Sequence, residues 1–247
     1  MNNRQCIIWS FVAVASHAGC HNLVTHVDVE TPTIGSDRAS VTGLVLDSDG
    51  APVVGATVTV RTSGEHATSD SMGAFTLDVP ANTTLTLSAT APNMAPTQLQ
   101  QFLVSPGANA VVEMPLVTID HFKSLAAMGA NPAGGVVAVA LKSMSGTGSL
   151  AGATVQLTPS LGRVMYAPTG TSMADPDPAM AAVMLSSVQA DESYAWALGV
   201  QPHVSAMQLT MHGVSQIDPP YAIDDVTYPG TFTVDAGTLT LVTLFTK

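Results

Sequence analysis

Four side chains in one irregular stretch of the sequence have the chemistry of a binding site. Arg163 and Tyr166 precede Asp175 and Asp177 within residues 159–182, a segment without packing periodicity. Arginine and tyrosine anchor many interfaces because each combines contact area with directed hydrogen bonds. We therefore expect this stretch to be a long surface loop that contacts a ligand or a partner, with a merely solvated loop as the alternative.

The remaining groups that could bind a metal or act in catalysis form no complete set. Asp47 and Asp49 have the carboxylate spacing that opens a calcium loop, yet no bidentate acid follows in register, which favours a simple acidic turn at Gly50. His203 and His212 have no third ligand near them in the sequence, whereas a zinc site usually has about four ligands. The sequence also lacks the Gly-x-Ser-x-Gly motif of serine hydrolases and the Gly-Lys-Ser or Gly-Lys-Thr phosphate motif. We therefore expect no catalysis, no bound metal and no cofactor.

A further reactive residue, Cys20, ends a segment with the features of a secretory signal. A positively charged start and an apolar run precede small residues, and the run is too short to span a membrane. Ala18-Gly19-Cys20 resembles the end of the lipobox of bacterial lipoproteins, with His17 where that family usually has leucine. The resemblance implies removal of residues 1–19, acylation of Cys20 and attachment to a membrane, the outer one because His21 follows rather than aspartate. Cleavage at an ordinary signal-peptidase site a few residues earlier, which leaves a free thiol, is the alternative.

The charge and cysteine content narrow the possible partners. The formal net charge is −11, which argues against nucleic acids and anionic membrane surfaces. Only 10% of the residues are charged, which suits an exported β-protein better than a cytosolic enzyme. Because Cys20 would be the one cysteine left after processing, no intrachain disulfide is expected.

The elements that must position these residues are short strands separated by turn residues. After a tether over residues 20–39, apolar residues alternate with polar ones around Val58 and again around Leu77. Turn signals at Asp49-Gly50 and Met72-Gly73 separate such runs. About seven strands at this spacing, without room for crossover helices, predict an antiparallel sandwich over residues 40–118.

Residues 119–133 change the pattern. Phe122, Leu125 and Met128 can share one helix face, Asp120 can cap the start of the helix, and Gly129 can end it. We expect one short helix that links two domains.

Residues 134–247 contain a second copy of one supersecondary unit. Gly55-Ala-Thr-Val58 recurs as Gly152-Ala-Thr-Val155, again after an apolar strand. The segment Leu239–Phe245 reads as a last strand buried on both faces. The predicted fold is all-β: two tandem antiparallel β-sandwiches joined by the helix.

The first domain carries a family signature. Gly43-x-Val45-x-Asp47-x-x-Gly50-x-Pro52-Val53-x-Gly55-Ala56-x-Val58 resembles the carboxypeptidase regulatory-like domain. The resemblance implies a transthyretin-like, Ig-like sandwich with an accessory role and no catalysis, and residues 134–247 resemble it more loosely. Intradiol dioxygenases share the signature and bind iron through tyrosine and histidine. Here Tyr194 alternates with Trp196 and Leu198 as core residues do, which disfavours an iron site.

These observations predict an exported, lipid-anchored, non-catalytic surface or interaction module of the cell envelope. Its partners would be the membrane, through the anchor, and an envelope protein or glycan. The alternative is a carbohydrate-binding protein on a starch-binding-like sandwich, because sugar sites stack rings on exposed aromatic residues. Exposed, coplanar Tyr166, Tyr221 and Tyr228 would favour that alternative.

Overall fold

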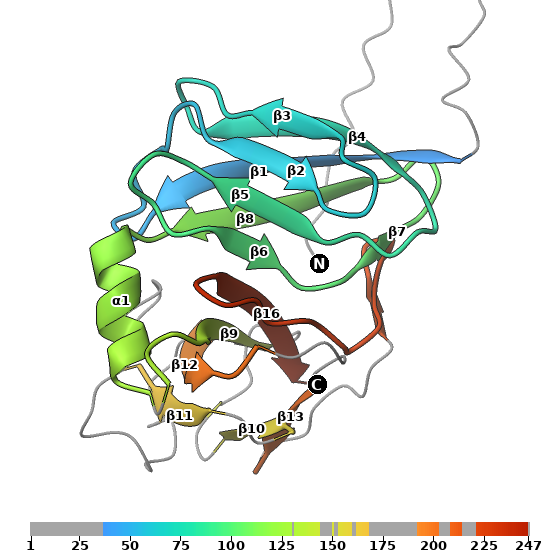
Figure 1. The fold of residues 1–247 in the computed structure, drawn as a ribbon. Helices are drawn as coiled ribbons and strands as arrows, with labels where there is room; N and C mark the ends of the chain where they lie inside the picture. The colour runs from blue at the N-terminus through green and yellow to red at the C-terminus, as the bar shows by residue number, and fades with distance from the viewer. Residues whose placement is uncertain are drawn as a thin grey trace, which may run out of the picture. The chain divides into compact units, whose positions relative to one another are not determined.

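The computed structural model describes residues 37–129, 131–143, 150, 153–159, 162–167, 192–202, 208–213 and 221–246 (Figure 1). The described residues all belong to one compact unit, Ile34–Lys247. The predicted signal segment, Cys20 and most of the tether therefore lie outside the described residues.

The strands fall into two regions, separated by the helix α1 (Ile119–Ala127). The strands of the first region are β1 (Arg38–Asp47), β2 (Thr57–Val60), β3 (His66–Thr68), β4 (Ala74–Pro80), β5 (Leu87–Thr90), β6 (Thr97–Leu99), β7 (Leu103–Val104) and β8 (Asn109–Leu116). Those of the second region are β9 (Gly135–Ser143), β10 (Thr154–Thr158), β11 (Arg163–Tyr166), β12 (Glu192–Val200), β13 (Gln208–His212), β14 (Tyr221–Ile223), β15 (Val226–Tyr228) and β16 (Leu239–Thr246). The predicted all-β class with one short helix is confirmed for the described residues.

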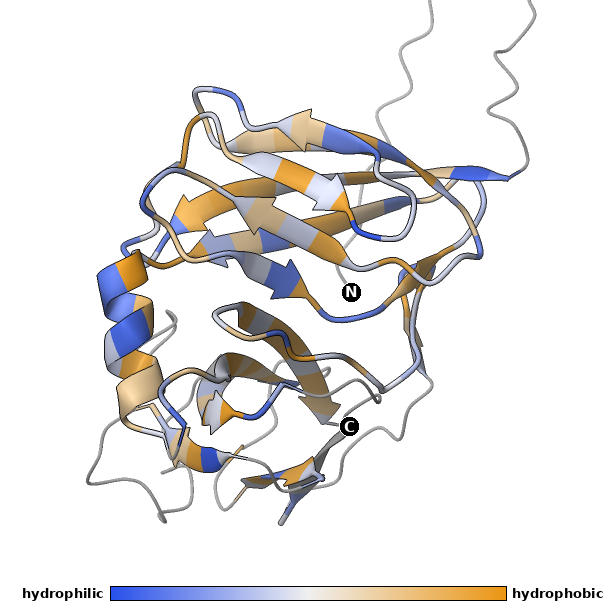
Figure 2. Cartoon of the chain, in the orientation of Figure 1, coloured by the Kyte–Doolittle hydropathy of each residue, from blue (hydrophilic) through white to orange (hydrophobic). Residues whose placement is uncertain are grey.

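The first region is a sandwich whose core follows from strand alternation. The sheet β4-β1-β8 packs against the strands β6-β5-β2-β3, and the apolar residues of alternate positions meet between them. Val41 and Val45 of β1 and Val58 and Val60 of β2 are all fully buried there. The alternation of hydrophobic and hydrophilic residues can be followed along these strands in Figure 2.

Two turns of the first region use the same hydrogen-bond pattern. The Asp47 carboxylate accepts the backbone N–H groups of Asp49 (2.9 Å) and Ala51 (2.8 Å), which forms the acidic turn expected there. The Asp70 carboxylate accepts those of Met72 (2.8 Å) and Ala74 (2.9 Å) in the same way. Each turn is an Asp-Ser-x-Gly-Ala segment with glycine at positive φ, a conformation that costs glycine little.

Gly43 shows why the family signature has a glycine in β1. A Cβ atom at this position would lie 2.3 Å from the Val112 carbonyl oxygen and 2.8 Å from the Phe75 ring. Only glycine lets the neighbouring strand β8 and the core ring approach so closely.

The expectation of purely antiparallel pairing is wrong for three strand pairs. β1 pairs with β8 in parallel, and β16 pairs in parallel with both β6 and β9. Through these last two pairings an eight-stranded sheet, β11-β12-β9-β16-β6-β5-β2-β3, includes strands of both regions. Hydrophobic alternation fixes which side of a strand is buried but carries no information about strand direction.

Three strands of the second region are buried on both faces, because this sheet has a packed layer on each side. Ala195 and Ala197 of β12 face one core cluster, whereas Trp196 and Leu198 face another. The same division holds for β9 and for the first half of β16, where Leu239–Val242 are all buried, as the sequence predicted.

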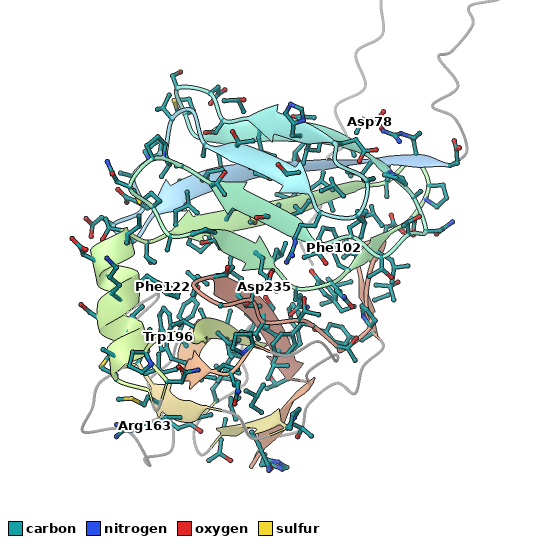
Figure 3. All side chains as sticks on the ribbon, in the orientation of Figure 1. Asp78, Phe102, Phe122, Arg163, Trp196 and Asp235 are labelled. Atoms are coloured by element: carbon teal, nitrogen blue, oxygen red, sulfur yellow. The ribbon has the colours of Figure 1, made fainter. Side chains whose placement is uncertain are left out.

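Helix α1 covers part of one of these faces. Its Phe122 and Leu125 belong to the same core cluster as Trp196, and Figure 3 labels Phe122 and Trp196. The cap is Thr118, whose side chain accepts the His121 N–H at 3.2 Å, so the expected cap at Asp120 is wrong by two positions. Asp120 lies in the first turn instead, where a carboxylate interacts favourably with the helix dipole.

A buried polar junction joins β6 to the second region. Gln98, only 1% exposed, donates from its amide to the Thr233 carbonyl (2.6 Å) and the Thr240 hydroxyl (2.9 Å). The Arg61 guanidinium donates to the Gln98 side-chain oxygen and, at 2.6 Å, to the Asp235 carboxylate. Because the buried Gln98 and Thr240 side chains are paired, and the more exposed Arg61 and Asp235 extend the network, the junction has a defined register rather than only apolar contact.

Candidate functional site

Part of the expected binding loop is a β-strand in the structure. Arg163 and Tyr166 lie on strand β11, which pairs with β12, so this part of the segment is not a loop. Tyr166 is 5% exposed, and its hydroxyl oxygen accepts the backbone N–H of Val155 at 2.9 Å. Tyr166 is therefore a core residue and unavailable to a ligand.

Arg163 is exposed and lies near the end of α1 (Figure 3), where its guanidinium donates to the Met128 carbonyl at 3.4 Å. Asp175 and Asp177 lie outside the described residues. Of the four expected site residues, the structure therefore describes two: Tyr166 is buried, and Arg163 is exposed beside the helix.

A different feature, a cleft of about 530 Å³, has the form of a ligand site. It lies between β8 of the first region and the sheet face formed by β9 and β16. Its volume falls within the usual range of small-molecule pockets, about 300–1,000 Å³. Local sequence pattern does not predict this cleft, because its walls come from segments far apart in the chain.

One wall of the cleft is the part of the sheet face that α1 leaves uncovered. Register places Tyr194, Ala140 and Thr243 in one row across β12, β9 and β16, and Lys142 pairs with Phe245 in the next. All five line the cleft. Trp196 lies in the preceding row of the same sheet face, where helix α1 packs against the sheet. The face therefore changes from core to cleft wall along the strands.

The opposite wall is the edge of β8. Val111, Val112, Glu113 and Pro115 all line the cleft. Because side chains alternate between the two faces of a strand, a wall that includes consecutive residues must be the edge of the strand. Val111 is 78% exposed, the most exposed of the large hydrophobic residues in the described part of the chain.

Aromatic rings close one end of the cleft. Tyr228 and Phe245 line it, and Tyr221 stacks on Tyr228 with ring centroids 5.2 Å apart and an interplanar angle of 25°. The Tyr221 hydroxyl donates to the Thr243 carbonyl at 3.0 Å, which fixes the pair on β16. Desolvation on burial, with a smaller contribution from Tyr228, raises the pKa of Tyr221, and burial also raises the pKa of Tyr228. Both phenols therefore stay neutral at physiological pH.

The charged lining is sparse and of both signs. Glu113 contributes a carboxylate from β8 and Lys142 an ammonium group from β9. Within the part of the chain that the structure describes, no three His, Cys, Asp or Glu side chains gather as metal ligands. The cleft thus offers apolar contact, aromatic faces and two opposite charges.

A second hollow, of about 590 Å³, lies on the first region and is more polar. Arg38, Glu65 and Asp78 line it, but the Arg38 guanidinium already contacts the carboxylates of Asp78 (3.1 Å) and Glu65 (3.6 Å). These ion pairs raise the pKa of Arg38, first through the hydrogen bond to Asp78. The arginine has its counter-ions within the chain, so this hollow is the weaker candidate.

No helix among the described residues has the length and apolar character to span a membrane.

Comparison with known proteins bears on the first region. Residues 40–117 match the model of the carboxypeptidase regulatory-like domain family. No curated protein matches the chain.

Several solved structures share some similarity of fold. A mutant of the type II cohesin–X-dockerin complex from Acetivibrio cellulolyticus is 20% identical over 33% of this chain, which spans 59% of the length of that one, with a TM-score of 0.29. The shaft pilin SpaA from Lactobacillus rhamnosus GG is 11% identical over 86% of this chain and 98% of its own, with a TM-score of 0.24. A candidate carbohydrate-binding protein from Bacteroides uniformis is 10% identical over 81% of this chain and 100% of its own, with a TM-score of 0.28. Values this low say nothing about ligands or partners.

The family match and the sandwich of β1 to β8 cover the same stretch of sequence. The signature glycine Gly43 and the turn at Asp47 both have a structural reason in this fold. Residues 40–117 are therefore similar to a carboxypeptidase regulatory-like domain.

Proposed function

We propose that the protein is a non-catalytic binding module of the cell envelope, held to the membrane through an acylated Cys20. The observation that carries the proposal is the cleft between β8 and the β9–β16 face, an open site with aromatic and apolar walls on a sheet scaffold. The family of the first region supports an accessory role, and the sequence around Cys20 supports export and anchoring.

The anchor can be tested with the two cysteines of the chain. Cells that express the wild type, Cys20→Ser or Cys6→Ser are labelled with an alkyne fatty acid and fractionated. We expect label and membrane association in the wild type and in Cys6→Ser, and loss of both in Cys20→Ser, because only Cys20 follows the Ala-Gly pair. If all three proteins partition equally, the lipid anchor is contradicted, and only export remains of this part of the proposal.

The second candidate function is carbohydrate binding in the same cleft. It is favoured by the rings of Tyr194, Tyr228 and Phe245, on which a sugar could stack. The exposed, coplanar trio that would have favoured this alternative does not form, because Tyr166 is buried and Tyr221 covers one face of Tyr228. We test this function on a glycan array with Tyr228→Ala, and with Val54→Ala as the control for an exposed residue outside the cleft. Binding lost only in Tyr228→Ala would support it.

We also propose accessory contacts with an envelope partner through Arg163, Asp175 and Asp177. Because Tyr166 is a core residue, its replacement would confound the test, so Arg163→Ala is the informative variant. We expect Arg163→Ala to leave the melting temperature nearly unchanged, since the side chain is exposed and its hydrogen bond is long. Unchanged capture of envelope material by this variant would reduce the segment to a solvated surface.

A further inference from the structure

The edge of β8 that faces the cleft has no described strand beside it. β8 is the terminal strand of the sheet β4-β1-β8. In its parallel pairing with β1, the Ser40 N–H donates to the Ala108 carbonyl, and every second residue of β8 continues this ladder. The backbone groups of the intervening residues, Val111 and Glu113, therefore point to the free edge. A row of such groups is a template for another extended chain.

The cleft gives this edge the surroundings that an added strand needs. Leu241 and Phe245 of β16 and Tyr228 of β15 line the same cleft as the edge and form its apolar wall. Side chains of an extended peptide project alternately to its two sides, so every second side chain would meet that wall. Pro115 has no N–H group and limits pairing at this end, which leaves Asn109–Glu113 as the usable length of about five residues.

We propose that the edge of β8 binds an extended peptide as an additional strand, with alternate apolar side chains against Tyr228 and Phe245. This proposal rests on the binding function proposed above and names the ligand of the same cleft. The net charge of −11 favours a basic peptide, whereas the two charges in the cleft lining, Glu113 and Lys142, offset each other. A second copy of this chain would carry the same negative charge and is disfavoured as the occupant.

The probe is a fluorescein-labelled hexapeptide that alternates valine and lysine, measured by fluorescence polarisation with the exported chain carrying Cys20→Ser. Its controls are the valine–glutamate peptide and a valine–lysine peptide with a central proline. We expect the first peptide to bind at least about tenfold more tightly than either control. Equal affinity for all three peptides, or binding to none, would overturn the proposal.

Val111 offers a matched pair of variants. Val111→Pro removes the N–H group that points to the free edge, whereas Val111→Thr keeps it together with the β-branched shape. Edge strands accept proline where the N–H group faces solvent, and unchanged melting temperatures would confirm that both variants fold. We expect about a tenfold or greater loss of affinity in Val111→Pro and little change in Val111→Thr.

Hydrogen exchange on the wild type keeps the proposal testable if Val111→Pro fails to fold. We expect the bound peptide to slow amide exchange at Val111 and Glu113, because their N–H groups then donate to it. Binding without this protection would overturn strand addition. Binding of an array glycan in place of any peptide would also overturn it while leaving the proposed binding function intact. If the wild type and Cys20→Ser were both soluble, this result would contradict the proposed lipid anchor but would leave the peptide site unaffected.

Discussion

The two regions contain the same Gly-Ala-Thr-Val segment and use it in different sheets. In the first region the segment leads into β2, which lies between β3 and β5 in the interior of the large sheet. In the second it leads into β10, which pairs with β13 in a separate two-stranded sheet. Val58 and Val155 are nevertheless both buried. The local repeat determines a strand and its buried side, whereas its neighbours are determined by the rest of the chain.

The regions also differ in how far each supplies its own core. The core cluster of the first region takes one buried residue, Val226, from outside that region. The cluster under α1 combines second-region residues such as Trp196 with Ala95 and Val117 of the preceding chain and with Phe122 and Leu125 of the helix. We infer that the first region depends little on the second, and that the second depends on the first and on α1.

The largest expected effect comes from separating the two regions. Residues 39–118 expressed alone should fold and melt cooperatively, because nearly their whole core is retained. Residues 132–247 alone should melt at a lower temperature and less cooperatively, because the fragment keeps the core cluster shared by β9, β10 and β12 but loses the helix and leaves β16 without β6. Far-UV circular dichroism and calorimetry measure both outcomes. Two fragments that fold equally well would instead support two independent domains, as the sequence suggested.

Two core substitutions sharpen the same asymmetry. Trp196 is 0% and Phe102 is 1% exposed, so replacing either by alanine should cost about 3–5 kcal/mol of unfolding free energy. Phe102→Ala should lower the stability of both regions, since the second depends on the first. Trp196→Ala should create an earlier transition confined to the second region. Calorimetric scans that show the same single shifted transition for both variants would argue for one cooperative unit.

The paired aspartate turns provide a smaller test within the first region. Asp47→Ala and Asp70→Ala should each cost about 1–2 kcal/mol, because each removes an acceptor for two backbone N–H groups in a solvated turn. Asp47→Asn and Asp70→Asn keep an oxygen acceptor and should retain most of the stability. Urea unfolding measures all four variants. Stabilisation of the wild type by added calcium would contradict the assignment of Asp47 to a turn.

The smallest expected effect is a pH dependence that involves only the aromatic end of the cleft. Because burial raises the pKa of Tyr228 and Tyr221, the folded state keeps protons that unfolded tyrosines release near pH 10. Stability should therefore be unaffected below about pH 10 and should fall as the pH rises above it. Tyr228→Phe should make this alkaline loss shallower in urea unfolding at about pH 8 and about pH 11. An identical loss in the variant would mean that Tyr228 is more hydrated than the structure indicates.

The sequence predicted the features that depend on local pattern. The burial of Val58, the turn at Asp47 and a helix with Phe122 and Leu125 on its packed face all follow from the order of neighbouring residues. The strand β11 was missed because its four residues are too few to display alternation, and both Met165 and Tyr166 are buried.

The cleft could not be predicted from local sequence pattern, for a different reason. Glu113 and Lys142 come from strands of different regions, and Tyr228 comes from a short hairpin that pairs with β7. The pairings of β16 with β6 and β9, and of β15 with β7, bring these segments together, and no periodicity in the sequence specifies those pairings.

The position of β16 has a consequence for the order in which the molecule assembles. Strands β6 and β9 are synthesised long before residues 239–246, yet each needs β16 as a neighbour. While the chain leaves the ribosome or crosses a membrane, both strands present unpaired edges, which are prone to adhere to other extended chains. A nascent chain halted before residue 239 would keep the contact of β15 with β7 but would leave the edges of β6 and β9 unpaired. If the chain is exported as proposed, we expect it to need a holding chaperone until its last strand has been synthesised.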